Sequence, residues 1–187
     1  MQVSNVRIYG KNESCVASGY PFRTDLPANS IDPSPKDIDR AKRLSCLDDG
    51  HDVFLQGVIV QFDLTCSIKM WTQLERYHFM NFVSSQSTMH KIEKMRINPD
   101  AANMNVDPRI LAILHELQDA YNSKKSEENF LKLIYSVPVG FLLTARLTSN
   151  LRQLKTIYKQ RKNHRLDEWR DFCKWITSVF YQVDLAC

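Results

Sequence analysis

Three polar residues near the C-terminal end of the sequence carry side chains that suit a ligand with a phosphate and a heterocycle. Asn150, Arg152 and Arg161 supply one carboxamide and two planar guanidinium groups, which form hydrogen bonds with phosphate oxygens and ring edges. In a helix, Asn150 and Arg161 face the same side because they are about three turns apart, whereas Arg152 is rotated away from both. The alternative is a surface helix whose arginines extend into water.

An apolar stripe anchors this helix, and the same spacing recurs along the chain. The stripe comprises Leu147, Leu151, Leu154 and Tyr158, which share one helix face. Apolar residues at helical spacing predict further helices over 36–47, 67–82, 107–121, 126–134 and 166–181, and a helical turn over 141–146. Residues 11–35 are rich in Pro, Ser, Asn and Gly, which predicts a polar loop or arm.

Alternating apolar residues predict two strands, a short one over 6–9 and a long one over 51–64. Gly57 interrupts the long run and indicates a bulge or a close approach of another segment. Together these elements predict an α+β fold, with a small, mainly antiparallel sheet and five to six flanking helices. We expect a single domain over residues 1–187.

The bulk composition narrows the class of protein. The 187 residues are 43% hydrophobic and 25% charged, which is typical of a globular domain. A net charge of +4 without a clustered basic stripe does not favour nucleic acid, and no apolar run approaches the length of a membrane span. The five cysteines and five histidines lack disulfide-framework or zinc spacing. We therefore expect a cytoplasmic protein with no structural metal and no disulfide framework.

Several short motifs follow one another in a fixed order. Gly50-His51 precedes the long strand, and a glutamine stands three residues before an arginine in Gln73-Leu74-Glu75-Arg76-Tyr77-His78. A serine-rich segment follows, and the last motif has the order Pro138, Thr144, Asn150, Arg152 and Arg161. This succession resembles the flavin-dependent thymidylate synthase (ThyX) family over residues 36–176.

The resemblance implies a ThyX-like fold and the reductive methylation of dUMP, or a related modification of a pyrimidine deoxynucleotide. It implies FAD as hydride carrier, NADPH as reductant and methylenetetrahydrofolate as source of the carbon unit. It also implies a homotetramer with a pyrimidine nucleotide as ligand. No side-chain nucleophile is demanded, which suits a chain that has no recognisable catalytic triad.

The same resemblance assigns roles to individual residues. FAD would contact His51, His78, Asn150 and Arg152. The nucleotide would contact Gln73, Arg76, Ser87 and Arg161, and Arg161 and Ser87 would be catalytic. Each position also has a structural alternative: Asn150 and Ser87 as helix caps, and Gln73 and Arg76 as a solvated helix face.

The chain departs from the family pattern at three places. His78 stands where the family has the second arginine of a triplet, Ser85 where it has an acidic residue, and Met89-His90 where it has Arg-Tyr. A largely neutral histidine is a poor replacement for a bidentate phosphate donor. These departures favour an alternative function, a diverged non-catalytic nucleotide-binding or interaction protein, for example one encoded by a phage.

Overall fold

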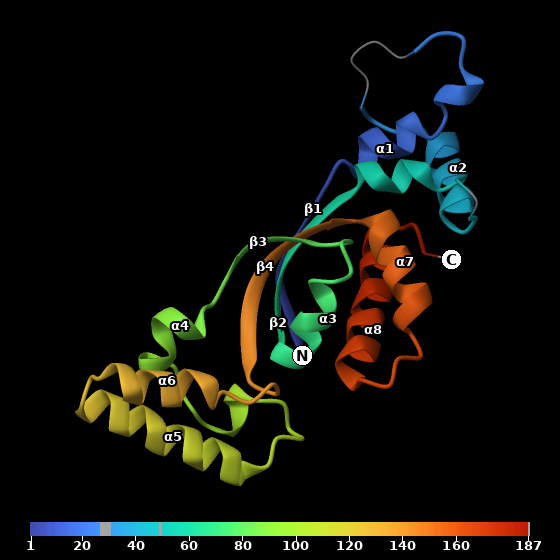
Figure 1. Ribbon diagram of the computed structural model, residues 1–187. Coiled ribbons are helices and arrows are strands. Elements are labelled where there is room, and N and C mark those ends of the chain that lie inside the picture. Colours follow the sequence, from blue (N-terminus) through green and yellow to red (C-terminus); the bar gives the residue numbers. More distant parts are fainter. Residues whose placement is uncertain (27–30, 49, 187) are drawn as a thin grey trace. The chain divides into compact units, whose positions relative to one another are not determined.

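The computed structural model describes residues 1–26, 31–48 and 50–186, and its strands form a four-stranded antiparallel sheet (Figure 1). The strand order is β1-β2-β4-β3. The strands are β1 Gln2–Tyr9, β2 Ile59–Ser67, β3 Asn81–Ser85 and β4 Leu142–Asn150. The predicted α+β class with a small antiparallel sheet is confirmed.

The helices include all six that helical spacing predicts. These are α2 Pro35–Ser45, α3 Ile68–Leu74, α5 Pro108–Ser123, α6 Glu127–Tyr135, α7 Leu151–Arg161 and α8 Asp167–Gln182. Two short helices, α1 Lys11–Ala17 and α4 Thr88–Lys91, add to them. Single turns of 3-10 helix occupy Tyr20–Phe22, Val53–Gly57, Ile92–Lys94 and Pro99–Ala101.

Two of the predicted element types are wrong in part. The strand expected over 51–64 begins only at Ile59 and follows the 3-10 helix Val53–Gly57. Gly57 does mark a close approach, since a Cβ there would collide with the Ser14 hydroxyl. The helical turn expected over 141–146 is strand β4, because its residues are alternately buried and half-buried with period two.

The segment 11–35 is more ordered than a loop or arm. Helix α1 buries Ser14, Cys15 and Val16, and this burial overrides the polar composition of the segment. Gly10 precedes the helix with a φ of 73°, and a side chain there would collide with the carbonyl oxygen of Gly57. Residues 27–30, part of the predicted arm, lie outside the described residues.

The register of β2 against β4 is fixed at both ends of the pair. The Leu151 amide donates to the Val58 carbonyl at 3.0 Å, and the Ile68 amide donates to the Phe141 carbonyl at 3.0 Å. This pairing sets Thr65 opposite Thr144, with hydroxyls 2.7 Å apart. It also sets Asp63 opposite Arg146 in a 3.2 Å ion pair, so polar cross-strand pairs reinforce the ladder.

The chain divides into two compact units. The first comprises Met1–Val3, Asp63–His78 and Phe82–Arg146. Its core contains Leu111 and Leu114 of α5 and Leu133 of α6, and α5 and α6 pack side by side (Figure 1). The Gln118 side chain donates to the carbonyls of Ile92 at 2.6 Å and Met95 at 2.8 Å, which ties α5 to the preceding segment.

The second unit comprises Ser4–Phe62, Phe79–Asn81 and Leu147–Cys187. Helices α7 and α8 pack against each other there. Phe62 of β2 contacts two rings of α8, with its centroid 5.8 Å from Phe172 and 4.5 Å from Trp175. Burial of these large rings dominates the stability of the unit.

Within the described ranges, no helix is long and apolar enough to cross a membrane. Among the same residues, no group of three or more His, Cys, Asp or Glu side chains is arranged to hold a metal ion. Cys46 is disulfide-bonded, a bond that the cysteine spacing did not indicate. Cys15, Cys66 and Cys173 are free and buried.

Candidate functional site

Asn150 is the last residue of β4 and the N-cap of α7. Its side-chain oxygen accepts from the Gln153 amide at 2.9 Å, and the Gln153 side chain accepts from the Asn150 amide at 3.2 Å. This reciprocal capping box satisfies two backbone groups that a helix start leaves without partners. The capping alternative is therefore realised, and the amide oxygen of Asn150 is engaged within the chain.

Arg152 is the second residue of the same helix and is held by a buried carboxylate. Its Nε donates to Asp52 at 3.1 Å, and Lys155 donates to the other oxygen of Asp52 at 2.8 Å. Asp52 has only 7% of its side chain exposed, so the three charges form a compact group. The bond to Asp52 uses only the Nε of Arg152 and not its terminal nitrogens. A third of the Arg152 side chain is exposed.

Asp52 is a residue that the sequence analysis missed. It directly follows His51, but nothing in its surroundings distinguishes it from an ordinary exposed acid. Its partners lie on α7, about a hundred positions later. Only the fold brings Asp52 to the face of α7 that carries Arg152 and Lys155.

Arg161 ends α7 and packs on a buried ring of α8. Its guanidinium carbon lies 5.2 Å from the centroid of the Trp169 ring, and Trp169 is fully buried. This cation–π contact fixes the orientation of the guanidinium plane. Asn150 and Arg161 are separated by about 16 Å along the helix axis, so the structure does not bring them into contact.

Two neighbouring groups feel the charge of Arg161. Burial, with repulsion from the Arg161 guanidinium as the second cause, lowers the pKa of the His164 imidazole. Burial raises the pKa of the Cys173 thiol to about 11, against an opposing contribution from Arg161. Both groups are therefore neutral at pH 7, and Cys173 is not a nucleophile.

His51 is exposed and belongs to the turn that follows Gly50. Its backbone amide donates to the Asp48 carbonyl at 3.3 Å. Gly50 has a φ of 91°, a conformation that glycine adopts without strain. His51 is thus exposed on a tight turn, and the residue that directly follows it, Asp52, is buried.

In the first unit, the predicted nucleotide contacts are on a shorter helix than expected. Ser67 caps α3 by accepting from the Met70 amide at 3.2 Å, and the helix ends at Leu74. Gln73 is half-buried in the last turn, whereas Arg76 is exposed and lies beyond the helix. The prediction that both residues share one helix face is wrong, because the backbone leaves the helix between them.

His78 occupies the left-handed region, with a φ of 48°. Histidine is among the residues that tolerate this region best after glycine, asparagine and aspartate. His78 therefore ends the turn after α3 and is exposed. An arginine at this position would offer a planar bidentate donor to phosphate, which an imidazole does not.

Ser87 stands at the N-cap position of α4, but its side chain makes no capping hydrogen bond. Helix α4 is only one turn of α-helix and is followed by the 3-10 turn Ile92–Lys94. The preceding Ser84 and Ser85 belong to β3 rather than to a loop. Gln86 extends the strand pairing, because its amide donates to the Thr144 carbonyl and its side chain accepts from the Thr144 amide, each at 2.9 Å.

The predicted site residues thus fall into separate groups within each unit. In the second unit, Arg152 is part of the Asp52 group and Arg161 stacks on Trp169, while His51 is exposed. In the first unit, Gln73, Arg76 and His78 are close together in sequence around the end of α3, and Ser87 follows β3.

No family model matches the sequence, and no curated protein matches it. Solved structures do match. The flavin-dependent thymidylate synthase ThyX from Helicobacter pylori, complexed with FAD and dUMP, superposes with a TM-score of 0.76 at 14% identity, over 99% of this chain and 97% of that one. A second ThyX structure from Helicobacter pylori with FAD and dUMP gives a TM-score of 0.73 at 16% identity, over 95% and 92% of the two chains. At such identities the likeness shows a shared fold.

Proposed function

We propose that this chain binds a pyrimidine deoxynucleotide and carries out flavin-dependent reductive methylation of dUMP or a related base modification. The observation that supports the proposal is the shared fold over nearly the whole length of a thymidylate synthase that was crystallised with FAD and dUMP. We further propose a homotetramer, which the resemblance to the ThyX family implies, located in the cytoplasm.

The nucleotide contacts that we propose, following the resemblance, are Gln73, Arg76, Ser87 and Arg161. An arginine and an amide can donate to phosphate oxygens or to base carbonyls. Arg161 would polarise a pyrimidine carbonyl and so favour addition to the ring. Its stacking on Trp169 supports this role, because a guanidinium already held in one plane loses less entropy on binding.

The residues proposed for FAD fit the group as hydrogen-bond donors. His51 and His78 are exposed, and Asn150 and Arg152 are reachable because each is half-buried. Amide, imidazole and guanidinium groups all donate to ring carbonyls or phosphate oxygens. Bound FAD would supply the hydride, with NADPH as its reductant and methylenetetrahydrofolate as carbon donor; the protein's part is orientation and electrostatics.

A second function is a nucleotide-binding or interaction protein that has lost flavin chemistry. The observation that favours it is the state of Asn150 and Arg152, which are engaged by Gln153 and by Asp52. A guanidinium already neutralised by a carboxylate offers less charge to a pyrophosphate. Under this reading the chain keeps the nucleotide contacts and loses the flavin contacts.

Visible absorbance and thermal shift distinguish these functions. The enzyme predicts that purified protein is yellow or that added FAD raises the melting temperature, since a ligand that binds only the folded state stabilises it. Colourless protein that responds to dUMP but not to FAD would establish the second function. A chain that responds to neither ligand would contradict the enzyme and the nucleotide binder, and would leave the interaction protein.

Arg161→Met tests the proposed nucleotide contact. Methionine keeps an apolar stem on Trp169 but removes the charge, so we expect the dUMP-induced shift to be lost while the unliganded melting temperature changes little. Arg165→Ala is the matched control, because Arg165 is exposed four residues later. An unchanged response to dUMP in Arg161→Met would remove Arg161 from the site.

A further inference from the structure

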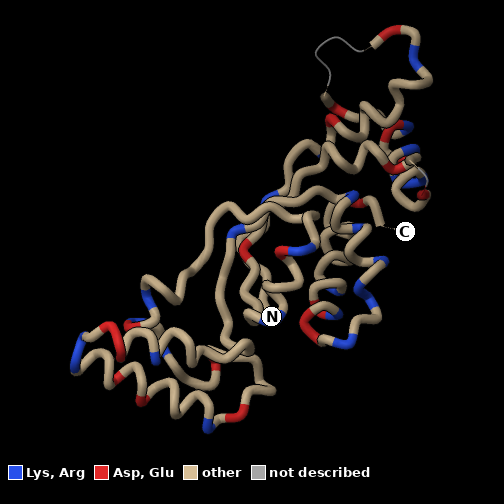
Figure 2. Tube along the Cα trace, viewed as in Figure 1, with Lys and Arg blue, Asp and Glu red and all other residues tan. Residues whose placement is uncertain are grey.

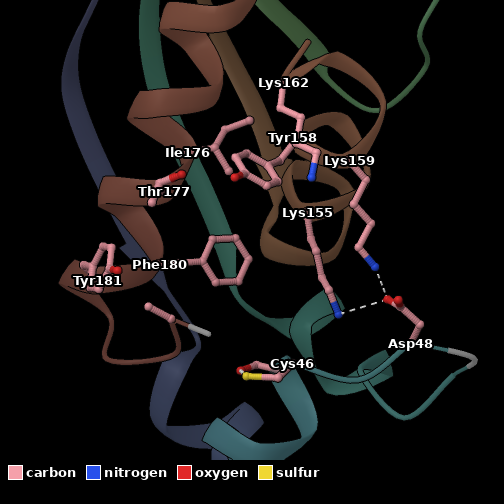
Figure 3. Close-up of a pocket in the computed structure, with 12 residues that line it drawn as sticks. Cys46, Asp48, Lys155, Tyr158, Lys159, Lys162, Ile176, Thr177, Phe180 and Tyr181 are labelled. Carbon is pink, nitrogen blue, oxygen red and sulfur yellow. Dashed lines mark hydrogen bonds and ion pairs between the residues drawn. The ribbon is translucent and has the colours of Figure 1, made fainter.

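A pocket of about 300 Å³ lies in the second unit, between the end of α2 and helices α7 and α8. Figure 3 shows its lining, in which side chains of α7 and α8 face the same hollow. The eight residues that resemblance assigns to FAD or nucleotide are absent from this lining. The pocket is therefore a separate feature of the second unit.

Three lysines line one side of the pocket. Lys155 and Lys159 belong to α7 and Lys162 is its C-cap residue. Their spacing of four and three residues sets them on one face of the helix end. Figure 2 shows the basic residues along α7, which contains no acidic residue between Leu151 and Arg161. A run of cations on one face creates a positive potential at the pocket mouth.

Among the described lining residues, one carboxylate, that of Asp48, contacts two of the three ammonium groups. Asp48 pairs with Lys159 and lies 3.3 Å from Lys155 (Figure 3), and the two lysines hold its pKa below the usual value. Lys162 instead lies over the Tyr158 ring, 5.7 Å from its centroid. The described lining thus carries more positive than negative charge. The binding of the Asp48 carboxylate by two lysines shows where an anionic group is stabilised.

The opposite side of the pocket is apolar and aromatic. Ile176 and Phe180 are four residues apart on α8 and line the pocket together with Tyr158. Figure 3 shows the Phe180 ring in the hollow and the ammonium groups of Lys155 and Lys159 reaching toward Asp48. Such a surface accepts the face of a planar ring, while the lysines accept a negative group attached to it.

We propose that this pocket binds a small aromatic anion, a single ring that carries a phosphate or a carboxylate. The ring lies against Phe180 and Tyr158, and the anionic group is held by Lys159 and Lys162. A volume of about 300 Å³ is at the lower end for small-molecule sites, which suits one ring with one charged group and excludes a dinucleotide. This activity is independent of the proposed nucleotide chemistry.

Isothermal titration of the full-length chain tests the proposal with three probes. Phenyl phosphate combines ring and anion, inorganic phosphate offers the anion alone, and benzyl alcohol offers the ring alone. We expect phenyl phosphate to bind at least about tenfold more tightly than either half, because a charge-assisted contact and ring burial each contribute roughly this factor. High salt is expected to weaken phenyl phosphate binding.

Substitutions then assign the site. Lys162→Ala should weaken phenyl phosphate about tenfold, whereas Lys174→Ala, on the exposed surface of α8 and paired with Asp171, should leave the affinity unchanged. Thr177→Phe keeps all three lysines and fills the hollow from α8, so we expect it to abolish binding. Circular dichroism of each variant verifies that it folds.

Several results would overturn the proposal. These are no heat of binding with phenyl phosphate, equal affinity for inorganic phosphate, or an unaltered affinity in Lys162→Ala. Competition is equally informative: saturating dUMP should leave the phenyl phosphate affinity unchanged, and displacement by dUMP would place the anion in the nucleotide site instead. Failure of dUMP to bind at all would leave the titration of this pocket unaffected.

Discussion

Two buried aspartates of the second unit each pair with two cations, but the cations come from different parts of the chain. Asp37 and Asp52 expose only 5% and 7% of their side chains, and each is paired with two cations. Asp37 accepts from Arg23 at 2.6 Å and from Arg40, whereas Asp52 accepts from two side chains of α7. A buried charge needs this compensation, since desolvation otherwise makes it costly.

The two groups differ in where their partners come from. Asp37 also takes part in the capping box of α2, accepting from the Ser34 hydroxyl at 2.7 Å and from the Ser34 amide at 3.1 Å. Its partners are therefore local in sequence, and the group holds the N-terminal segment together. Asp52 instead binds Arg152, a residue proposed to contact FAD. This ion pair neutralises a guanidinium charge that would otherwise be available to the ligand.

The largest expected effect is on the Asp37 group. Asp37→Asn leaves Arg23 and Arg40 without their carboxylate, and we expect the free energy of unfolding to fall by about 3 kcal/mol. Urea denaturation measures this loss. Asp171→Asn, which breaks the exposed pair with Lys174, should cost less than about 0.5 kcal/mol. Similar losses in the two variants would show that burial does not distinguish these aspartates.

Acid should remove the contribution of Asp37 in wild type but not in Asp37→Asn. The Ser34 hydroxyl bond is the main cause that lowers the pKa of Asp37 in the folded state, with the two arginines adding to it. Because the unfolded chain then binds the proton first, this stability is present above the ordinary carboxyl pKa of about 4 and is lost as the pH falls below it.

Urea midpoints at neutral and acidic pH provide the measurement. Asp48, Glu93, Asp107, Glu128 and Asp171 also have lowered pKa values in the folded state, and they titrate in both proteins. The difference between wild type and Asp37→Asn therefore isolates Asp37. Parallel acid profiles for the two proteins would contradict the prediction.

The smallest effect concerns the pairing of Asp52 with Arg152. In a double-mutant cycle of Asp52→Asn and Arg152→Gln, we expect a coupling energy of about 1 kcal/mol, since the contact joins a buried carboxylate to a partly exposed guanidinium. Lys155 remains bound to position 52 in either background. A coupling energy near zero would mean that Arg152 is available to a ligand without cost.

The sequence predicted the α+β class because its helices carry long apolar stripes that only a core accommodates. It failed at 141–146, where Leu142, Leu143, Ala145 and Leu147 fit a helical spacing as well as an alternating one. Burial of every second residue in β4 decides between the two, and that burial depends on pairing with β2. Short apolar runs of this kind are ambiguous until their partner is known.

For the candidate site, the sequence found residues but not their partners. The capping role of Asn150 was an open alternative because its Gln153 lies three residues away. The partners of Asp52, the support of Arg161 by Trp169 and the lysine-lined pocket all depend on contacts between separate elements of secondary structure. His78 was placed on a helix because helical spacing continues past Leu74, whereas its positive φ becomes visible only in the structure.

The direct passage from β4 into α7 limits how this part of the chain can vary. Asn150 both ends the strand and caps the helix, and the Leu151 amide donates to the Val58 carbonyl. No loop residue therefore separates the strand from the helix. One inserted residue between Leu147 and Asn150 would invert the strand faces before it or turn the helix by about 100°. Every basic side chain of α7 would then point elsewhere. Insertions and deletions should therefore be tolerated in surface connections such as that between α5 and α6, and selected against here.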